Sequence, residues 1–198
     1  YTSVGVLSTD TISTIATRIA DEVTANTELP ITASATLGVT TFVAKNGGTV
    51  GNDMPIILNW FGASSNHFTP DGLTVTIAQS VAGATDPDVG DAIAVFSDTI
   101  INHIVCPYSD NTSLTAIKDE MDRRWNPIIQ LEGHAFTASK GTASALITIG
   151  GGHNNEHLTY WDSGQTNPTP SYVRLCALVG RAAPAIEIDP ARPVQTLD

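Results

Sequence analysis

The stretch IINHIVCPY at residues 100–108 has the composition of a buried β-strand. Ile104 and Val105 are branched and apolar, and Cys106 behaves as a small hydrophobic residue. Helical patterns stand on both sides of this stretch, at residues 86–98 and 113–125. Because a strand with helices on both faces lies inside a layered sheet, we expect residues 100–108 to be the central strand of an α/β unit.

The second half of the chain alternates strands and helices around this stretch. Four strands are predicted, each followed by a helix: strands at 73–79, 100–108, within 128–137 and at 157–161, and helices at 86–98, 113–125, 142–149 and 172–183. Pro184 is expected to lie beyond the last helix, since proline interrupts helical hydrogen bonding. This order predicts an α/β fold with a mostly parallel layered sheet, flanked by helices and joined by right-handed crossovers.

The first 60 residues predict a small α+β unit that precedes this sheet. Its elements are strands at 1–7, 31–37, 39–44 and 54–60, and an amphipathic helix that runs from Thr11 to about Asn26. The glycine-rich residues 45–52 lack the ending of a P-loop and are predicted to form a turn. Residues 61–72 are polar and read as a link, so the predicted domains are 1–60, a β-α-β-β-β unit, and 73–198, the α/β core.

Composition and charge argue against several partners. The chain has 198 residues, of which 41% are hydrophobic and only 15% charged, and its formal net charge is −11. It has no basic stripe for nucleic acid, and no apolar run approaches the ~20 residues that a membrane span needs. The first residue is Tyr1 rather than Met and no signal-peptide pattern follows, so we expect a processed or excised piece of a longer protein.

One motif suggests metal chemistry. Residues 153–157 (HNNEH) match H-x-x-E-H, in which a helix places two histidines on one face to bind zinc while the glutamate acts as base. Three glycines precede His153 and the strand-like LTYW follows His157, so the helical frame is missing and no third ligand is evident. A polar loop is therefore the preferred interpretation, and a zinc hydrolase is the alternative.

Other candidate residues have simpler interpretations. Residues 140–142 (KGT) lack the upstream glycines of a phosphate-binding loop and read as a helix cap. Cys106 and Cys176 sit in apolar surroundings in different elements, which predicts two buried free thiols rather than a disulfide. The residues therefore assign no catalytic, cofactor-binding or metal-binding site. A carbohydrate- or surface-binding module would need exposed aromatic side chains, and the candidates fall in predicted strands and are expected in the core: Trp60, Tyr160 and Trp161.

Several motifs along the chain carry a resemblance to a known family. In order they are KNGGTVGN at 45–52, GATDPD at 83–88, IVCPYSD at 104–110, KGT at 140–142, PTPSY at 168–172 and IDPARPVQTL at 188–197. With these motifs in this order, the chain resembles the tail sheath proteins of Mu-like contractile bacteriophages.

The resemblance implies a structural protein, not an enzyme, with no cofactor. Sheath subunits stack as six-fold rings around a tail tube, and contraction drives the tube through the host envelope. The implied partners are other copies of the sheath protein, the tail tube protein, the baseplate and the tail terminator, in a virion tail assembled in the host bacterial cytoplasm. The implied fold is a subtilisin-like sheath core without the catalytic residues of the protease.

Two further expectations follow from the resemblance. The family's terminal arms add strands to neighbouring subunits, and these arms are expected to lie outside this chain, so we expect this fragment to be monomeric. Arg192 stands between two prolines in an extended stretch and is a candidate inter-element or inter-subunit contact. The alternative is that Arg192 caps the last helix or pairs with a carboxylate such as Asp189.

Overall fold

The computed structural model describes residues 1–79, 81–162 and 164–189, and these form two compact units. The first unit contains residues 1–47 and 56–82, and the second contains residues 48–55 and 83–198. The chain therefore passes from one unit to the other more than once. The division predicted from the sequence, into residues 1–60 and 73–198 with a link at 61–72, stays a prediction.

The first unit is a helix packed on one face of a β-hairpin. Helix α1 (Ile12–Ala25) begins at Thr11, whose side chain accepts a hydrogen bond from the backbone of Thr14 in a capping box. Strands β1 (Ile31–Thr36) and β2 (Val39–Ala44) are antiparallel, with Thr36 opposite Val39. The turn between them has positive φ angles, at Leu37 and Gly38, and is as tight as the sequence predicted. The helix buries three residues: Ala16, Ala20 and Val23.

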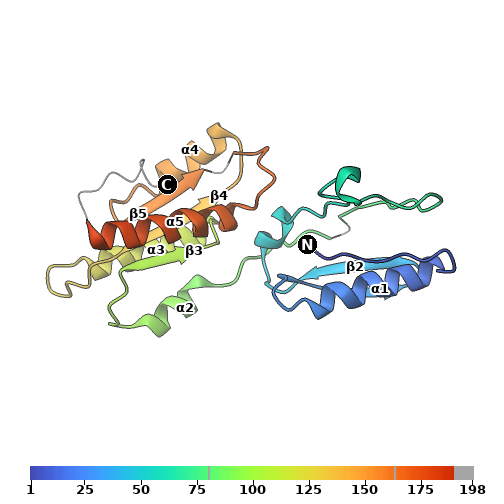
Figure 1. The fold of residues 1–198 in the computed structure, drawn as a ribbon. Helices are drawn as coiled ribbons and strands as arrows, with labels where there is room; N and C mark the ends of the chain where they lie inside the picture. Colours follow the sequence, from blue (N-terminus) through green and yellow to red (C-terminus); the bar gives the residue numbers. More distant parts are fainter. Residues whose placement is uncertain (80, 163, 190–198) are drawn as a thin grey trace. The chain divides into compact units, whose positions relative to one another are not determined.

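The second unit is a parallel sheet with helices on both faces (Figure 1). Its strands are β3 (His103–Cys106), β4 (His134–Ser139) and β5 (Leu158–Asp162), in the order β3-β4-β5. Its helices are α2 (Val89–Phe96), α3 (Asn111–Arg124), α4 (Ala143–Gly152) and α5 (Ser171–Ile188). The predicted mixed α/β class and the parallel sheet are confirmed. The described residues also form two short 3₁₀ helices: Thr49–Asp53 in the second unit and Ala63–Ser65 in the first.

Alternate residues of β4 build two separate cores. Ala135 faces α3 and is fully buried with Leu114 and Met121. Phe136 faces α5 and packs with Leu175. Apolar surface removed from water contributes about 25 cal/mol for each Å², so burial on both faces of β4 stabilises the sheet. Two layers around one strand make a three-layer α/β/α sandwich.

Three strands predicted from alternating residues are not strands in the structure. Residues 1–7, 54–60 and 73–79 have no strand assignment. Alternation favours an extended backbone, but a strand also needs a hydrogen-bonded neighbour. Val75 and Ile77, from the most regular of these patterns, are 43% and 48% exposed, so the apolar face has no layer to cover it within the part of the chain that the structure describes.

Two further expectations about the second unit were wrong. Strand β3 was expected at the centre of the sheet, but β4 lies there, and Val105 of β3 remains 39% exposed. Helix α5 was expected to end before Pro184, yet it continues to Ile188. Gly180 and Pro184 are both exposed, so water can satisfy the Gly180 carbonyl that loses its donor to the proline.

No helix among the described residues is long and apolar enough to cross a membrane.

Limited proteolysis with chymotrypsin should cut the native chain first within residues 61–72. Phe61 and Phe68 are 46% and 58% exposed, whereas Phe136 in β4 is 9% exposed. Proteases cut backbone that opens at low cost, and exposed loops open before core strands. Fragments identified by mass spectrometry should therefore end at Phe61 or Phe68. Early cleavage after Phe136 would contradict the predicted layout.

Candidate functional site

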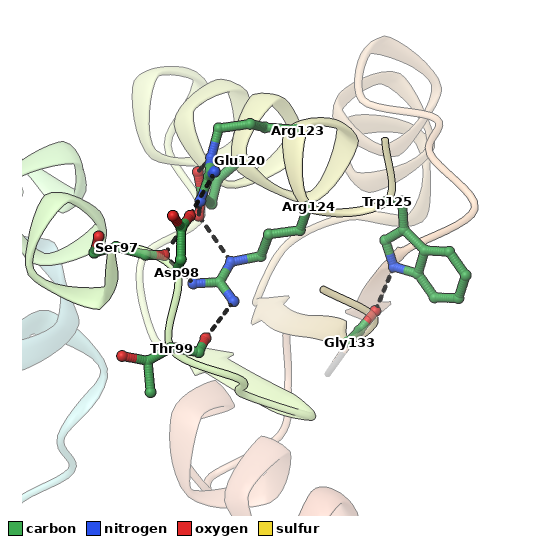
Figure 2. Close-up of polar contacts among 8 residues, drawn as sticks. All are labelled: Ser97, Asp98, Thr99, Glu120, Arg123, Arg124, Trp125 and Gly133. Carbon is green, nitrogen blue, oxygen red and sulfur yellow. Dashed lines mark hydrogen bonds and ion pairs between the residues drawn. The ribbon is translucent and has the colours of Figure 1, made fainter. Parts of the chain in front are cut away.

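A network of charged side chains on α3 fixes the connection between α2 and β3 (Figure 2). Arg124 is fully buried, and its Nε donates to Oε1 of Glu120 at 2.7 Å. Its other nitrogens donate to the carbonyls of Thr99, at 2.9 Å, and Ser97, at 3.2 Å. Arg123 binds the same Glu120 through two nitrogens and also reaches Asp98 at 3.2 Å. One carboxylate thus organises two guanidinium groups.

The charge state of this network follows from its geometry. Hydrogen bonds from Arg123 lower the pKa of Glu120, and those from Arg124 lower it further, against the opposing effect of burial. The Glu120 hydrogen bond raises the pKa of Arg123. Both partners therefore stay ionised at neutral pH, and the buried charge of Arg124 is compensated within hydrogen-bond distance. The network has a structural role, because its guanidinium groups bind backbone carbonyls of the chain and do not line an open cavity.

Two of the sequence motifs meet in a second polar contact. Asn52, from residues 45–52, donates to the carbonyl of Gly83 and accepts from its backbone nitrogen, both at 2.8 Å. The hydroxyl of Thr49 donates to the Asp86 carboxylate at 2.9 Å. A Cβ at Gly83 would collide with the carbonyl of Gly48, so only glycine allows this approach. The motifs were noticed separately in the sequence, and their contact was not predicted.

The HNNEH stretch does not form a metal site. Helix α4 ends at Gly152, so His153 and His157 do not share a helical face. Nε2 of His153 lies 2.9 Å from Oδ1 of Asn111, and the ring of His157 stacks on Trp125 with centroids 4.1 Å apart. Among the described residues, no three His, Cys, Asp or Glu side chains come together in a way that could hold a metal ion. The stretch instead ties the α4–β5 loop to α3.

The remaining candidates have structural roles. Thr142 caps α4, as expected for residues 140–142, by accepting from the backbone of Ala145. Trp161 packs against the core beside α5, with the Arg174 guanidinium 4.9 Å from its ring, whereas Trp60 is 62% exposed and its expected place in the core was wrong. Arg192 lies outside the described residues.

The two thiols differ in exposure. Cys106 is buried, and burial raises the pKa of its thiol, which donates to the carbonyl of Tyr108 at 3.5 Å. Cys176 is exposed on α5, so the expectation of two buried thiols was wrong for this residue. Both are free, as predicted. The error arose because α5 is apolar on its outer as well as its inner face.

A cavity of about 220 Å³ lies between α2, β3 and α3. Val89, Ile93 and Phe96 line it from α2, and Ile104 and Cys106 line it from β3. Its wall is mostly apolar, and the Glu120 carboxylate that borders it is engaged by two arginines. The cavity therefore offers space without a set of polar groups that would orient a substrate.

Comparison with known proteins assigns the chain to a class. Residues 82–198 match the family model described as the phage tail sheath protein central domain. The chain belongs to the phage tail sheath family, whose members are structural proteins, so it is a tail component of a bacteriophage and not an enzyme.

One relative is the Mu-like prophage FluMu tail sheath protein of Haemophilus influenzae, which is 31% identical over 192 residues. The alignment covers 97% of this chain and 39% of the relative, so the chain spans well under half the length of that protein. The resemblance to Mu-like sheath proteins seen in the sequence is confirmed.

Replacing Arg124 should destabilise the second unit strongly. In Arg124→Met, the Thr99 carbonyl loses its side-chain donor, the Ser97 carbonyl keeps only the donor from Arg123, and Glu120 keeps only Arg123 as a partner. Removing one partner of a buried pair costs about 3–5 kcal/mol, and we expect the lower end because Arg123 remains. Urea unfolding followed by tryptophan fluorescence measures the change.

Lys118→Met is the matched control for this substitution. Lys118 is also on α3 and also has a carboxylate four residues away, but its Nζ lies 3.9 Å from Asp122 and the pair is partly exposed. Exposed pairs of this kind contribute well under about 1 kcal/mol. Equal losses in the free energy of unfolding would show that the buried network contributes no more stability than the partly exposed pair.

Thiol labelling should separate the two cysteines. In native protein, a disulfide reagent such as Ellman's should modify Cys176 within minutes and leave Cys106 unmodified, because only an exposed thiolate reacts. In urea without reductant, two thiols should titrate. Cys176→Ser is the control and should show no rapid native reaction. Finding fewer than two thiols in urea would reveal a disulfide.

Proposed function

We propose that this chain is the body of a contractile tail sheath subunit, which stacks as six-fold rings around the tail tube. The observation that carries the proposal is the family match over residues 82–198, the greater part of the second unit. Contraction of the assembled sheath would drive the tube through the host envelope. The three-layer sheet would be the sheath core, in a subtilisin-like arrangement that performs no catalysis.

The surface of the chain supports a role in a polymer of like copies. Only 15% of the residues are charged, and several of the charged side chains bind one another inside the units, as Glu120 and Arg124 do. Neutral polar residues therefore form much of the surface. Contacts between copies at such a surface carry little desolvation cost for charge.

The sheet edges support strand exchange. Strands β3 and β5 each have one strand neighbour within the described part of the chain, so each forms an outer edge of the sheet. Such an edge can accept an added strand through main-chain hydrogen bonds. We propose that segments of the sheath protein beyond the length covered by this chain add strands between neighbouring subunits.

The proposed partners follow from this role. They are other copies of the sheath protein along the tail, the tail tube protein within it, and the baseplate and tail terminator at its ends. Assembly would take place in the cytoplasm of the host bacterium, and the product would be part of the virion tail. The net charge of −11 also favours a reversible contact, since like-charged copies repel at low salt.

The proposal predicts different assembly states for this chain and for its full-length parent. Sedimentation velocity at micromolar concentration should find this 198-residue chain monomeric, because surface contacts between acidic copies are weak without added strands. Electron microscopy of the full-length parent should show helical tubes. The two measurements compare the same sequence without and with the segments that are proposed to drive polymerisation.

Two outcomes would count against the proposal. A stable hexamer of this chain would show that the body alone holds the ring and that strand addition is unnecessary. A full-length parent that stays monomeric at high salt, where repulsion is screened, would contradict the sheath role itself.

A further inference from the structure

Three of the five histidines of the chain stand in one row across the second unit's sheet. In the parallel register His103 of β3 pairs with His134 of β4. Ala135 pairs with Leu158, and its nitrogen donates to the carbonyl of His157, which places His157 beside His134. Neighbouring strands are about 4.8 Å apart, so the row puts ionisable rings on adjacent strands. This row could not be predicted from the sequence, because its members lie 23 to 54 residues apart along the chain.

The central histidine has no charged partner of its own. Nε2 of His134 lies 2.8 Å from the hydroxyl of Thr159, and its ring centroid is 4.9 Å from that of Phe136. Burial lowers the pKa of His134, and the neighbouring His157 and His103 lower it further. These contacts all favour the neutral ring.

The outer histidines each have a carboxylate nearby. Nε2 of His103 lies 3.5 Å from Oε1 of Glu187 on α5, and Nε2 of His157 lies 3.4 Å from Oε1 of Glu156. Both ring nitrogens of His103 are buried and lack a hydrogen-bond partner among the described groups. Each outer ring thus lies beside a carboxylate, although solvent weakens both pairs because Glu187 and Glu156 are 56% and 86% exposed, whereas His134 has no such carboxylate among the described residues.

Other charged groups near the row do not change this balance. On α3, the buried Arg124 is engaged with Glu120 and with the Ser97 and Thr99 carbonyls. Glu132, two residues before His134, is exposed, so solvent screens its effect. Glu187 approaches the row from α5 at its His103 end.

We propose that His103, His134 and His157 form an acid-sensitive latch, which holds the amino-terminal ends of β3, β4 and β5 together while the rings are neutral. The central ring is half-buried, its Nε2 lies within hydrogen-bond distance of the Thr159 hydroxyl, and no described carboxylate stands beside it as Glu187 and Glu156 stand beside the outer rings. The central ring can take up a proton only if the strand ends separate and admit water. This inference concerns the sheet itself and does not depend on the proposed assembly.

The direction of the pH effect follows from linkage. The pKa of His134 is lower in the folded than in the unfolded chain, whose histidines have a pKa near 6.5. Below about pH 6.5 the unfolded chain therefore binds more protons. The stability that the neutral ring contributes is fully present above that pH and is lost as the pH falls through the folded pKa.

The test compares the pH dependence of unfolding in three proteins. Urea unfolding of the wild-type chain is measured between pH 7.5 and 5.0, together with His134→Gln and the control His153→Gln. Glutamine keeps a neutral amide near Thr159 but cannot titrate. His153 lies in the same unit and outside the row, where it contacts Asn111. One proton taken up on unfolding changes the unfolding equilibrium constant roughly tenfold per pH unit.

We expect His134→Gln to remove up to that tenfold change per pH unit below pH 6.5, while His153→Gln follows the wild type. Equal pH dependence in all three proteins would overturn the latch. NMR titration of the wild-type histidine rings provides the second readout if His134→Gln does not fold. The ring assigned to His134 should titrate below the value of about 6.5 of an unfolded chain's histidine, and titration at or above that value would also overturn the proposal.

Discussion

The architecture of the second unit depends on the burial of one guanidinium group, that of Arg124. The segment between α2 and β3 is irregular, and Ser97 within it has a positive φ angle of 43°, which costs energy for a residue with a Cβ. Its carbonyls have no strand or helix to pair with. Arginine meets this need because its planar fork donates several hydrogen bonds in fixed directions, which the point charge of lysine does not. Glu120 then keeps the buried cation neutralised.

Side chains also hold other irregular segments in place by hydrogen bonds. The side-chain amide of Asn52 satisfies both backbone groups of Gly83, as a strand neighbour would. In the first unit, Arg18 binds Asp10 through two nitrogens just before α1, and this lowers the pKa of the Asp10 carboxyl. A chain with only nine Lys and Arg residues thus uses some of its few cations to hold loops. With 20 Asp and Glu residues against these nine cations, the chain keeps an excess of negative charge.

Elements with local signals could be predicted from the sequence. The cap predicted at residues 140–142 is confirmed by a hydrogen bond from the backbone of Ala145 to Thr142, and the predicted starts of α1 and α3 lie within two residues of the observed ones. These signals lie within four residues of the feature they specify. The tight turn at Gly38 and the alternation of strands and helices in the second half are local in the same sense, and they were enough to give the fold class.

Features that need a partner elsewhere in the chain could not be predicted. The alternation in residues 73–79 predicts an extended backbone, but it does not predict whether another strand is present to pair with it. Strand order is also non-local, and the richer apolar content of residues 100–108 pointed to the wrong centre. Pro184 shows the converse case, since a rule against proline in helices fails where solvent reaches the freed carbonyl.

In the candidate site, too, features with a local signal could be predicted and features that depend on packing could not. For the HNNEH stretch, the three preceding glycines predicted the end of the helix that the structure shows at Gly152. The contact of Glu120 with Arg124 has the i, i+4 spacing of an ordinary surface pair, and spacing does not distinguish it from Lys118 and Asp122. Only the packing of α2 against α3 buries one pair and leaves the other partly exposed. In a proposed sheath, where subunits would move against one another, the buried pair would help each subunit keep its fold.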